Sequence, residues 1–243
     1  KLSPRPLIMT AAYNEAGNIN NFIAEVRAAL GDAEILIVED NSPDGTGDII
    51  GELMENDDKL HIISRQGKLG VGSAHLEGIK WAYAQEFTQL VTMDCDFAHK
   101  PSDIALFLKE AETSDVVVGN RFVLGDSLAG WNWRRKLLTH LGHRVTKMFL
   151  GIPFDATGAY RAYRLDKIDQ RIFGLVNSGS YSFFFESMFV FCNNGLKVTE
   201  VPIQLPARTY GSSKMRLTDV VWSVCFILLL ALRRVFKSSS FKK

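Results

Sequence analysis

The first half of the chain alternates short apolar runs with segments of helical periodicity. Five runs rich in β-branched and other apolar residues predict strands at Pro6–Thr10, Glu34–Val38, Leu60–Ser64, Gln89–Met93 and Val116–Gly119. Between them, apolar residues recur every three to four positions and predict helices over Ile19–Leu30, Thr46–Met54, Ser73–Ala84 and Ser102–Ala111. This alternation predicts an α/β fold with a mostly parallel sheet covered by helices.

The second half is less regular. Leu137–Phe149 has the pattern of an amphipathic helix, which suits either a membrane interface or a core. Tyr181–Cys192 is rich in phenylalanine, and Glu186 is its one charged residue. Val198–Ile203 predicts another strand, and residues 217–237 predict a final helix that is apolar and then basic. Because no repeat or linker divides the chain, we expect one domain over residues 1–243, with a first half (1–118) and a second half (119–243).

Polar side chains follow all five strands predicted in the first half. Parallel strands end at one edge of a sheet, and open α/β sheets bind ligands there. We therefore expect the binding site to be built from these residues: Tyr13, Asn14, Glu15, Glu39, Asp40, Asn41, Arg65, Lys68, Asp94, Asp96, Asn120 and Arg121.

Charge is distributed unevenly between the two halves. Residues 1–118 carry 9 Lys and Arg against 20 Asp and Glu, whereas residues 119–243 carry 19 against 7. A basic half is typical of contact with phosphate or anionic lipid, although pairing between the halves explains it equally well. The net charge of +1 names no partner, and we expect no nucleic acid among the partners.

Neither the cysteines nor the N-terminal residues indicate an extracellular protein. Cys95, Cys192 and Cys225 match no zinc spacing and are expected to be reduced thiols of an intracellular protein. The N-terminus lacks a signal-peptide pattern. The uncharged run Val220–Leu232 has 13 residues. As a helix it would be about 20 Å long, whereas a bilayer core is ~30 Å thick, so we expect it not to span alone.

Asp94-Cys95-Asp96 is the strongest candidate for chemistry. In an extended segment, residues i and i+2 share a face, so both carboxylates would point the same way. They repel one another unless a hard cation such as Mg²⁺ or Mn²⁺ joins them. At the end of a central strand, such a cation would offset the charge on a nucleotide diphosphate.

Other polar segments admit two interpretations each. Asp40 could bind a base or ribose, whereas Asn41–Gly45 has the composition of a turn, and both can hold. The glycine-rich segment Arg65–Ala74 opens a helix like a phosphate cradle, but it lacks a Walker A ending, which disfavours ATP hydrolysis. Five cations are either solvated or phosphate ligands: Arg121, Arg134, Arg135, Arg208 and Lys214.

Taken together, these motifs resemble those of the dolichyl-phosphate mannose synthases, inverting family-two glycosyltransferases of GT-A fold. Single motifs such as Asp-x-Asp are weak signals, but the ordered combination is specific and covers nearly the whole chain. The matching segments are Ala12–Glu15, Glu39–Thr46, Gly67–Gly70, Met93–Asp96, Gly119–Phe122, Trp133–Lys136, Asp155–Tyr163, Glu200–Ile203 and Arg208–Lys214.

The resemblance implies that residues 1–118 are the nucleotide-sugar half and residues 119–243 the acceptor half, and it implies roles for individual residues. Asp94 and Asp96 would bind Mg²⁺ or Mn²⁺ and, with Arg121 and Arg208, serve catalysis. Arg135 and Thr139 would receive the lipid phosphate. The nucleotide-sugar site would comprise Ala11, Tyr13, Glu15, Val38, Asp40, Asp94, Cys95, Asp96, Arg121, Arg208 and Lys214.

The chain departs from the usual pattern of this family at several positions. Ala11 and Ala12 stand where a proline is usual, and Glu39 replaces the first of two aspartates. Ala98 stands where some relatives have a further metal ligand, so water or His99 would fill that role. Ala159-Tyr160-Arg161 stands where Gly-Phe-Arg is common. None of these departures removes an essential carboxylate.

The implied reaction transfers mannose from GDP-mannose to dolichyl or another polyprenyl phosphate with inversion. We expect peripheral binding on the cytoplasmic side of a membrane. This membrane would be the endoplasmic reticulum in a eukaryote or the plasma membrane in a prokaryote. Membrane-anchoring partner subunits are one way in which the protein could be held there. The alternatives are UDP-glucose as donor, another family-two transfer reaction, or an inactive nucleotide-sugar-binding scaffold. We further expect Asp96, as an exposed carboxylate, to be replaceable by Ala with loss of transfer and little unfolding.

Overall fold

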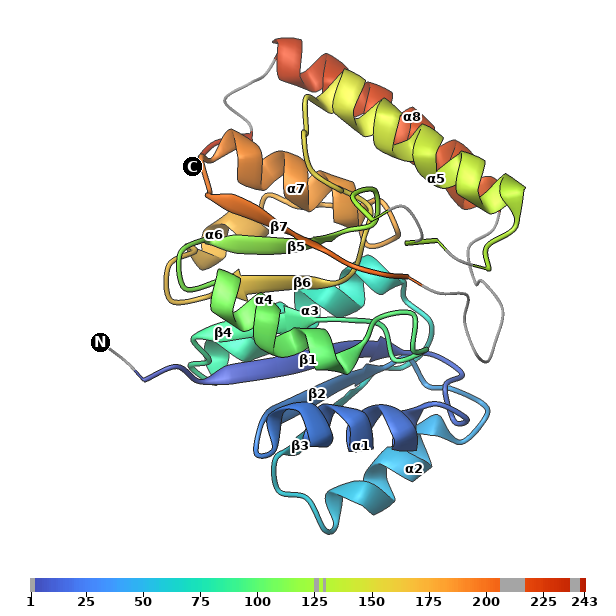
Figure 1. Ribbon diagram of the computed structural model, residues 1–243, viewed down its shortest axis with the longest axis vertical. Helices are drawn as coiled ribbons and strands as arrows, with labels where there is room; N and C mark the ends of the chain where they lie inside the picture. The colour runs from blue at the N-terminus through green and yellow to red at the C-terminus, as the bar shows by residue number, and fades with distance from the viewer. Residues whose placement is uncertain (1–2, 125–126, 129, 206–216, 237–240) are drawn as a thin grey trace.

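A seven-stranded mixed sheet forms the centre of the molecule (Figure 1). The computed structural model describes residues 3–124, 127–128, 130–205, 217–236 and 241–243. The strand order is β3-β2-β1-β4-β6-β5-β7, and β6 is antiparallel to both of its neighbours. The strands are β1 (Pro6–Ala12), β2 (Glu34–Glu39), β3 (Leu60–Ser64), β4 (Gln89–Thr92), β5 (Val116–Asn120), β6 (Arg161–Arg164) and β7 (Val198–Pro202).

The α/β fold and all the strands predicted from the sequence are confirmed. The structure adds one strand, β6, that the sequence did not predict. β6 has four residues and begins and ends with arginine, so it lacks the apolar alternation that marks a strand. The parallel register sets Ala12 beside Glu39 and Met9 beside Thr92. The carboxyl ends of β1, β2 and β4 therefore lie at one edge, as expected.

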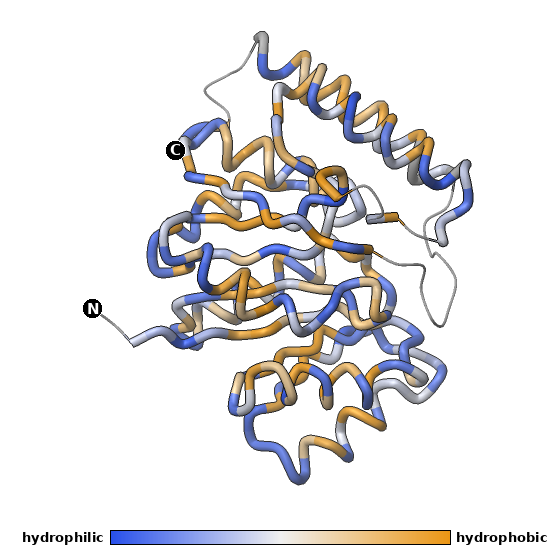
Figure 2. Tube along the Cα trace, viewed as in Figure 1, coloured by the Kyte–Doolittle hydropathy of each residue, from blue (hydrophilic) through white to orange (hydrophobic). Residues whose placement is uncertain are grey.

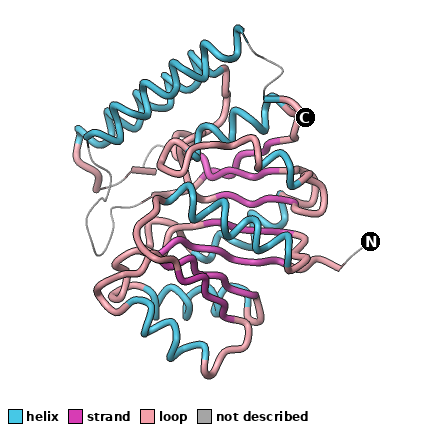
Figure 3. Tube along the Cα trace, turned by 180° about the vertical axis from the view of Figure 1, so that it is seen from behind, coloured by secondary structure: helices cyan, strands magenta, loops and turns pink. Residues whose placement is uncertain are grey.

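Helices cover both faces of the sheet. One face carries α1 (Ile19–Leu30), α2 (Thr46–Met54) and α4 (Ile104–Glu110), which follows the 3-10 turn η1 (Pro101–Asp103). Figure 3 shows the molecule from behind, where the other face carries α3 (Val71–Ala84), α6 (Gln170–Phe173) and α7 (Phe183–Asn193). Each face has its own apolar core, so the sheet is buried on both sides, as its apolar strands require.

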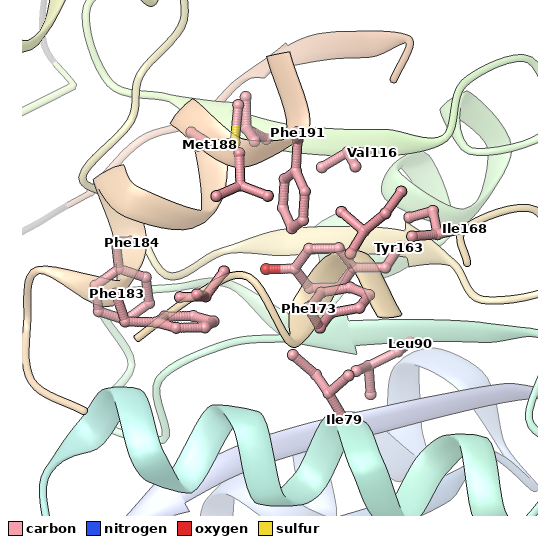
Figure 4. Packing of buried hydrophobic residues seen from close by; sticks show 14 of the residues in the cluster. Ile79, Leu90, Val116, Tyr163, Ile168, Phe173, Phe183, Phe184, Met188 and Phe191 are labelled. Carbon is pink, nitrogen blue, oxygen red and sulfur yellow. The ribbon is translucent and has the colours of Figure 1, made fainter. Parts of the chain in front are cut away.

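The phenylalanine-rich segment of the sequence belongs to the core. Phe191 of α7 packs edge-to-face on Phe173, with ring centroids 5.3 Å apart, and on Tyr163 of β6 at 6.0 Å (Figure 4). The hydropathy colouring shows that apolar residues predominate along the strands (Figure 2). Burial of large aromatic side chains contributes strongly to the stability of this half.

Two further helices lie beyond α7 at one end of the molecule (Figure 1). They are α5 (Trp133–Val145), continued by the π-helical turn η2 (Thr146–Leu150), and α8 (Leu217–Phe236). α5 begins four residues before the predicted start, because the Asn132 side chain caps it by accepting a bond from the Arg135 amide at 2.8 Å. α8 packs on η2, where Arg234 Nη1 donates to the Leu150 carbonyl at 3.0 Å.

The predicted apolar side of α5 is largely exposed to solvent. Leu137, Leu141, Met148 and Phe149 are exposed, whereas Val145 is half-buried. Of the two interpretations, an interface or a core, this exposure favours the interface. Among the described residues, no helix combines the length and the apolar character needed to cross a bilayer.

Candidate functional site

The loops after β1 and β2 are tied together at the sheet edge. The Asn14 amide donates to Ser42 Oγ at 3.0 Å, and the Glu15 amide donates to Thr46 Oγ1 at 3.0 Å. Glu39 closes the turn after β2 by accepting bonds from the amides of Asn41 and Ser42, at 2.8 and 2.7 Å. The turn expected over residues 41–45 is therefore present, and Glu39 stabilises it.

Backbone strain gathers at the same edge. Three of the four non-glycine residues with positive φ in the described chain follow strands there: Asn14, Asn41 and Phe97, with φ of 56°, 53° and 60°. A bulky residue such as Phe97 pays a steric cost in this conformation. Such residues concentrate at functional sites, because the surrounding structure must hold them in place.

Asp40 at the end of β2 is held by a buried ion pair. Its Oδ1 lies 2.8 Å from Arg65 Nη1, and both side chains are less than a tenth exposed. Burial raises the pKa of Asp40, and the Arg65 charge and the amides of Leu69 and Gly70 only partly oppose it. Nearby, Lys68 Nζ lies 4.6 Å from the centre of the Tyr13 ring. The predicted nucleotide residues Ala11 and Val38 are register partners just before these loops.

Asp94 and Asp96 flank Cys95 in the loop after β4. Burial raises the pKa of the Cys95 thiol, and the charges of Glu15, Asp94 and Asp96 raise it further. Carboxylate oxygens are the ligands that Mg²⁺ and Mn²⁺ prefer, so the chemistry of Asp94 and Asp96 suits a hard divalent ion. Among the described residues, no three His, Cys, Asp or Glu side chains are grouped as a metal site of protein ligands alone would require.

The structure corrects two expectations about this loop. Asp96 is only 6% exposed, and its Oδ1 accepts a bond from the Ala98 amide at 3.0 Å, so it is not an exposed carboxylate. His99 is buried, and its Nδ1 accepts a bond from the Asp94 amide at 2.9 Å. This nitrogen is thus occupied by the backbone, and His99 orients the loop instead of binding the metal through Nδ1.

Arg121 at the end of β5 is fixed by a second buried ion pair. Its Nε and Nη2 donate to the two carboxylate oxygens of Asp155 at 2.8 and 2.7 Å, and Nη2 also donates to Thr157 Oγ1. Burial lowers the pKa of Arg121, but the interaction with Asp155 outweighs it, and Asp94 raises the pKa further. Glu200 of β7 in turn accepts a bond from the Asp155 amide at 2.8 Å. Because β4 and β5 are both antiparallel to β6, Arg121 and the loop that holds Asp94 lie at the same edge of the sheet.

The predicted acceptor residues lie on the helix that packs beside Arg121. Thr139 and Arg135 on α5 are four residues apart, so they share a face, and His143 continues it. His143 stacks on Phe122, the residue after Arg121, with ring centroids 4.2 Å apart. The Arg135 guanidinium lies 3.5 Å from the centre of the Trp131 ring. The contact of α5 with Phe122 brings this helix to the Arg121 loop.

Part of the segment Arg65–Ala74, the candidate phosphate cradle, is bound to other parts of the protein. The Ser73 amide at the start of α3 donates to the Gly179 carbonyl at 3.0 Å. The amides of Leu69 and Gly70 interact with Asp40. These three amides therefore already have partners, and the phosphate cradle stays a prediction. The glycines have another cause, because a Cβ at Gly70 would lie 2.4 Å from the Gly179 oxygen.

Sequence reasoning assigned no role to Asp155, Thr157 or Glu186. Asp155 and Thr157 reach the site because β6 is antiparallel, so the loop before it lies at the edge where the other strands end. The available signal for Glu186 was a single acid within an apolar helix. Arg208 and Lys214 lie outside the described residues, as does the Arg134 side chain, and the roles expected of all site residues stay predictions.

Comparison with known proteins places the chain in a family. The model of the family described as Glycosyl transferase family 2 matches residues 7–172. The chain belongs to this family. As a family 2 glycosyltransferase it is an enzyme.

Two bacterial family 2 proteins are similar over most of their length. The polyprenol monophosphomannose synthase of Mycolicibacterium smegmatis is 35% identical over 214 residues, covering 87% of this chain and 81% of that protein. The undecaprenyl-phosphate mannosyltransferase of Micrococcus luteus is 32% identical over 212 residues, covering 87% of each.

Solved structures confirm the fold of this family 2 enzyme. A mycobacterial protein superposes with a TM-score of 0.63 at 15% identity, covering 95% of this chain and 74% of that one. Staphylococcus aureus TarS in complex with UDP-GlcNAc superposes with a TM-score of 0.55 at 14% identity, covering 96% and 72%. The seven-stranded sheet with helices on both faces is thus the GT-A arrangement.

Proposed function

We propose that this enzyme transfers mannose from GDP-mannose to a polyprenyl phosphate, dolichyl phosphate included. The observation that carries the proposal is that Asp94 and Asp96 follow β4, and Arg121, held by Asp155, follows β5, at the same edge of the sheet. The names of the two bacterial relatives support mannose as the sugar and polyprenyl phosphate as the acceptor. The family resemblance supports GDP-mannose as the donor.

The segment Asp94-Cys95-Asp96 would hold the divalent ion that the reaction is expected to need. Asp94 and Asp96 are the ligands proposed, because their carboxylates offer hard oxygens on one loop. Bound there, Mg²⁺ or Mn²⁺ would offset negative charge on the nucleotide diphosphate. Tyr13, Glu15 and Asp40, on the loops after β1 and β2, would bind the nucleoside.

The acceptor phosphate is already an anion, so the reaction needs no strong general base. One phosphate oxygen would attack the anomeric carbon from the side opposite the leaving group, at about 3–3.5 Å. The new carbon–oxygen bond forms as the bond to the diphosphate breaks, and GDP leaves with the electron pair. Inversion converts an α-linked donor into a β-mannosyl phosphate. Arg121, with Arg135 and Thr139, would reduce the repulsion between the two phosphate groups.

The exposed apolar residues of α5 and α8 support a peripheral position on a membrane. Trp222 is 74% exposed and Met148 is 70% exposed, and further exposed apolar residues line both helices. Arg144, Lys147 and Arg233 are exposed close to them, and cations attract anionic lipids. We propose that this surface rests on the cytoplasmic leaflet and brings α5 to the lipid phosphate. Sedimentation with anionic vesicles tests this point, and Trp222→Ser should weaken the binding.

A donor and acceptor matrix tests the function. Purified enzyme is incubated with GDP-mannose or UDP-glucose, with dolichyl or undecaprenyl phosphate, and with Mg²⁺, Mn²⁺ or EDTA. We expect a β-mannosyl lipid phosphate with GDP-mannose alone, and none with EDTA. A glucosyl lipid would replace the proposed donor, and absence of turnover with every pair would favour a nucleotide-sugar-binding scaffold.

A further inference from the structure

Glu186 is a fully buried acid in the apolar helix α7. Its Oε2 accepts bonds from the backbone amides of Asn177 and Ser178, at 3.1 and 2.7 Å. Through these two bonds the carboxylate ties the loop that precedes the helix to α7. With no exposed surface, Glu186 does not reach a substrate and cannot act as a base on one.

The loop held by Glu186 closes on the start of α3. The Gly179 carbonyl accepts a bond from the Ser73 amide at 3.0 Å. At Gly72, a Cβ would lie 2.6 Å from both the Ser180 oxygen and the Phe183 Cβ. The two segments touch so closely that Gly72 leaves no space for a side chain. The glycine-rich sequence therefore serves this contact.

The start of α3 in turn fixes the ion pair at the end of β2. The Ser73 hydroxyl accepts a bond from Arg65 Nη2 at 2.5 Å, and it donates to the Gly70 carbonyl at 2.8 Å. Arg65 Nη1 lies 2.8 Å from Asp40 Oδ1. Asp40 also interacts with the Gly70 amide. A movement at the start of α3 would therefore move Arg65 and Gly70, which both interact with the Asp40 carboxylate.

These contacts form one continuous relay from the acceptor half to the nucleotide half. We propose that Glu186 is a positioning residue for the donor nucleotide, acting through residues 177–180 and the start of α3 on Asp40. The inference rests on the proposed function in one respect, the role of Asp40 at the nucleoside. It assigns to residues 177–186 a part in donor binding that no motif in that segment indicates.

The test compares two substitutions of the same residue. Glu186→Leu fills the volume but removes the acceptor, whereas Glu186→Gln keeps one oxygen for both amides. We expect Glu186→Leu to weaken GDP binding about tenfold in calorimetry, and Glu186→Gln to stay within about twofold. Asn193→Ala is the matched control, because it removes a bond to the Phe189 carbonyl within the same helix and does not touch the loop.

Hydrogen exchange gives a readout that needs no activity. In Glu186→Leu, the amides of Asn177, Ser178 and Ser73 should exchange faster than in the wild type, whereas Asn193→Ala should leave them unchanged. Acceptor KM should change less than donor KM in Glu186→Leu. A general loss of stability would affect both substrates alike.

Each outcome decides the inference. Faster exchange with wild-type GDP affinity overturns it, as does unchanged exchange at Ser73. If Glu186→Leu does not fold, Gly72→Ala disturbs the same contact from α3 with Glu186 intact, and it must then weaken GDP binding. A wild-type enzyme that binds no GDP and transfers no sugar removes the proposed function, while the exchange data still report whether the relay exists.

Discussion

The two halves of the sheet edge each hold one charged group with a buried partner, and the signs are exchanged between them. In the first half an acid, Asp40, faces the proposed nucleoside site and is held by Arg65. In the second half a cation, Arg121, faces the proposed phosphate site and is held by Asp155. The group expected to meet substrate is thus of opposite sign in the two halves.

The comparison shows how one edge can serve two different ligands. A nucleobase offers N–H donors, which a carboxylate accepts, whereas phosphates require cations. In both pairs the partner fixes the direction of the side chain before substrate arrives. Preorganised groups need no reorganisation during the reaction, which is why burial of both pairs favours catalysis.

Asp155→Ala breaks the ion pair with Arg121, and of the changes considered it should have the largest effect on the free energy of unfolding. Arg121 would remain buried without its counter-charge, so we expect a loss of about 3–5 kcal/mol in the free energy of unfolding. Urea denaturation measures it. The double variant Arg121→Ala/Asp155→Ala should lose less than the sum of the two single variants, and additive losses would show that the pair is not coupled.

The same pair should make the free energy of unfolding decrease at acidic pH. Burial raises the pKa of Asp155, but the charge and hydrogen bonds of Arg121 outweigh it and hold the pKa below its ordinary value. Its contribution is therefore complete above about pH 4 and is lost as the pH falls through the lowered pKa.

Asp96→Asn should reduce transfer by about 10²–10³-fold, because it removes a negative charge from the proposed metal site. The amide oxygen of Asn can still accept the bond from the Ala98 amide. Unfolding should therefore change little, whereas Asp96→Ala adds the loss of that bond. Steady-state transfer measured against Mn²⁺ concentration checks the prediction, and activity within twofold of the wild type would remove Asp96 from the metal site.

Arg65→Met should weaken GDP binding about tenfold, because Asp40 would lose its counter-charge and burial alone would favour its protonated form. Arg65→Lys keeps a charge but loses the fork of donors, so its effect should be intermediate. Calorimetric titration with GDP distinguishes the two. Wild-type affinity in Arg65→Met would show that the first pair serves the fold alone.

His75 on α3 tests the packing between the halves with a smaller effect. Burial, together with a smaller contribution from the Arg161 charge, lowers its pKa from 6.5 to about 3. Between these values the unfolded chain binds a proton that the folded protein does not, so stability falls as the pH decreases. Between pH 6.5 and about pH 5.5 the loss should be about 1 kcal/mol, and His75→Leu should lack this component in pH-dependent denaturation.

The sequence predicted the sheet edge well because parallel strands obey local rules. Apolar runs end where Asp40, Asp94 and Arg121 begin, and the parallel connections bring these ends together. β6 escaped prediction because its burial comes from tertiary packing, so the roles of Asp155 and Thr157 stayed hidden. The Glu186 relay depends on contacts between segments about a hundred residues apart, which no local pattern encodes.

The most direct test of the account is the position of Mn²⁺ in a crystal of the enzyme with GDP, located by anomalous scattering. We expect one ion bound by the carboxylates of Asp94 and Asp96 and by diphosphate oxygens, on the side that faces Arg121. Mn²⁺ and diphosphate bound at another edge of the sheet, or GDP bound with both carboxylates uninvolved, would contradict the central claim.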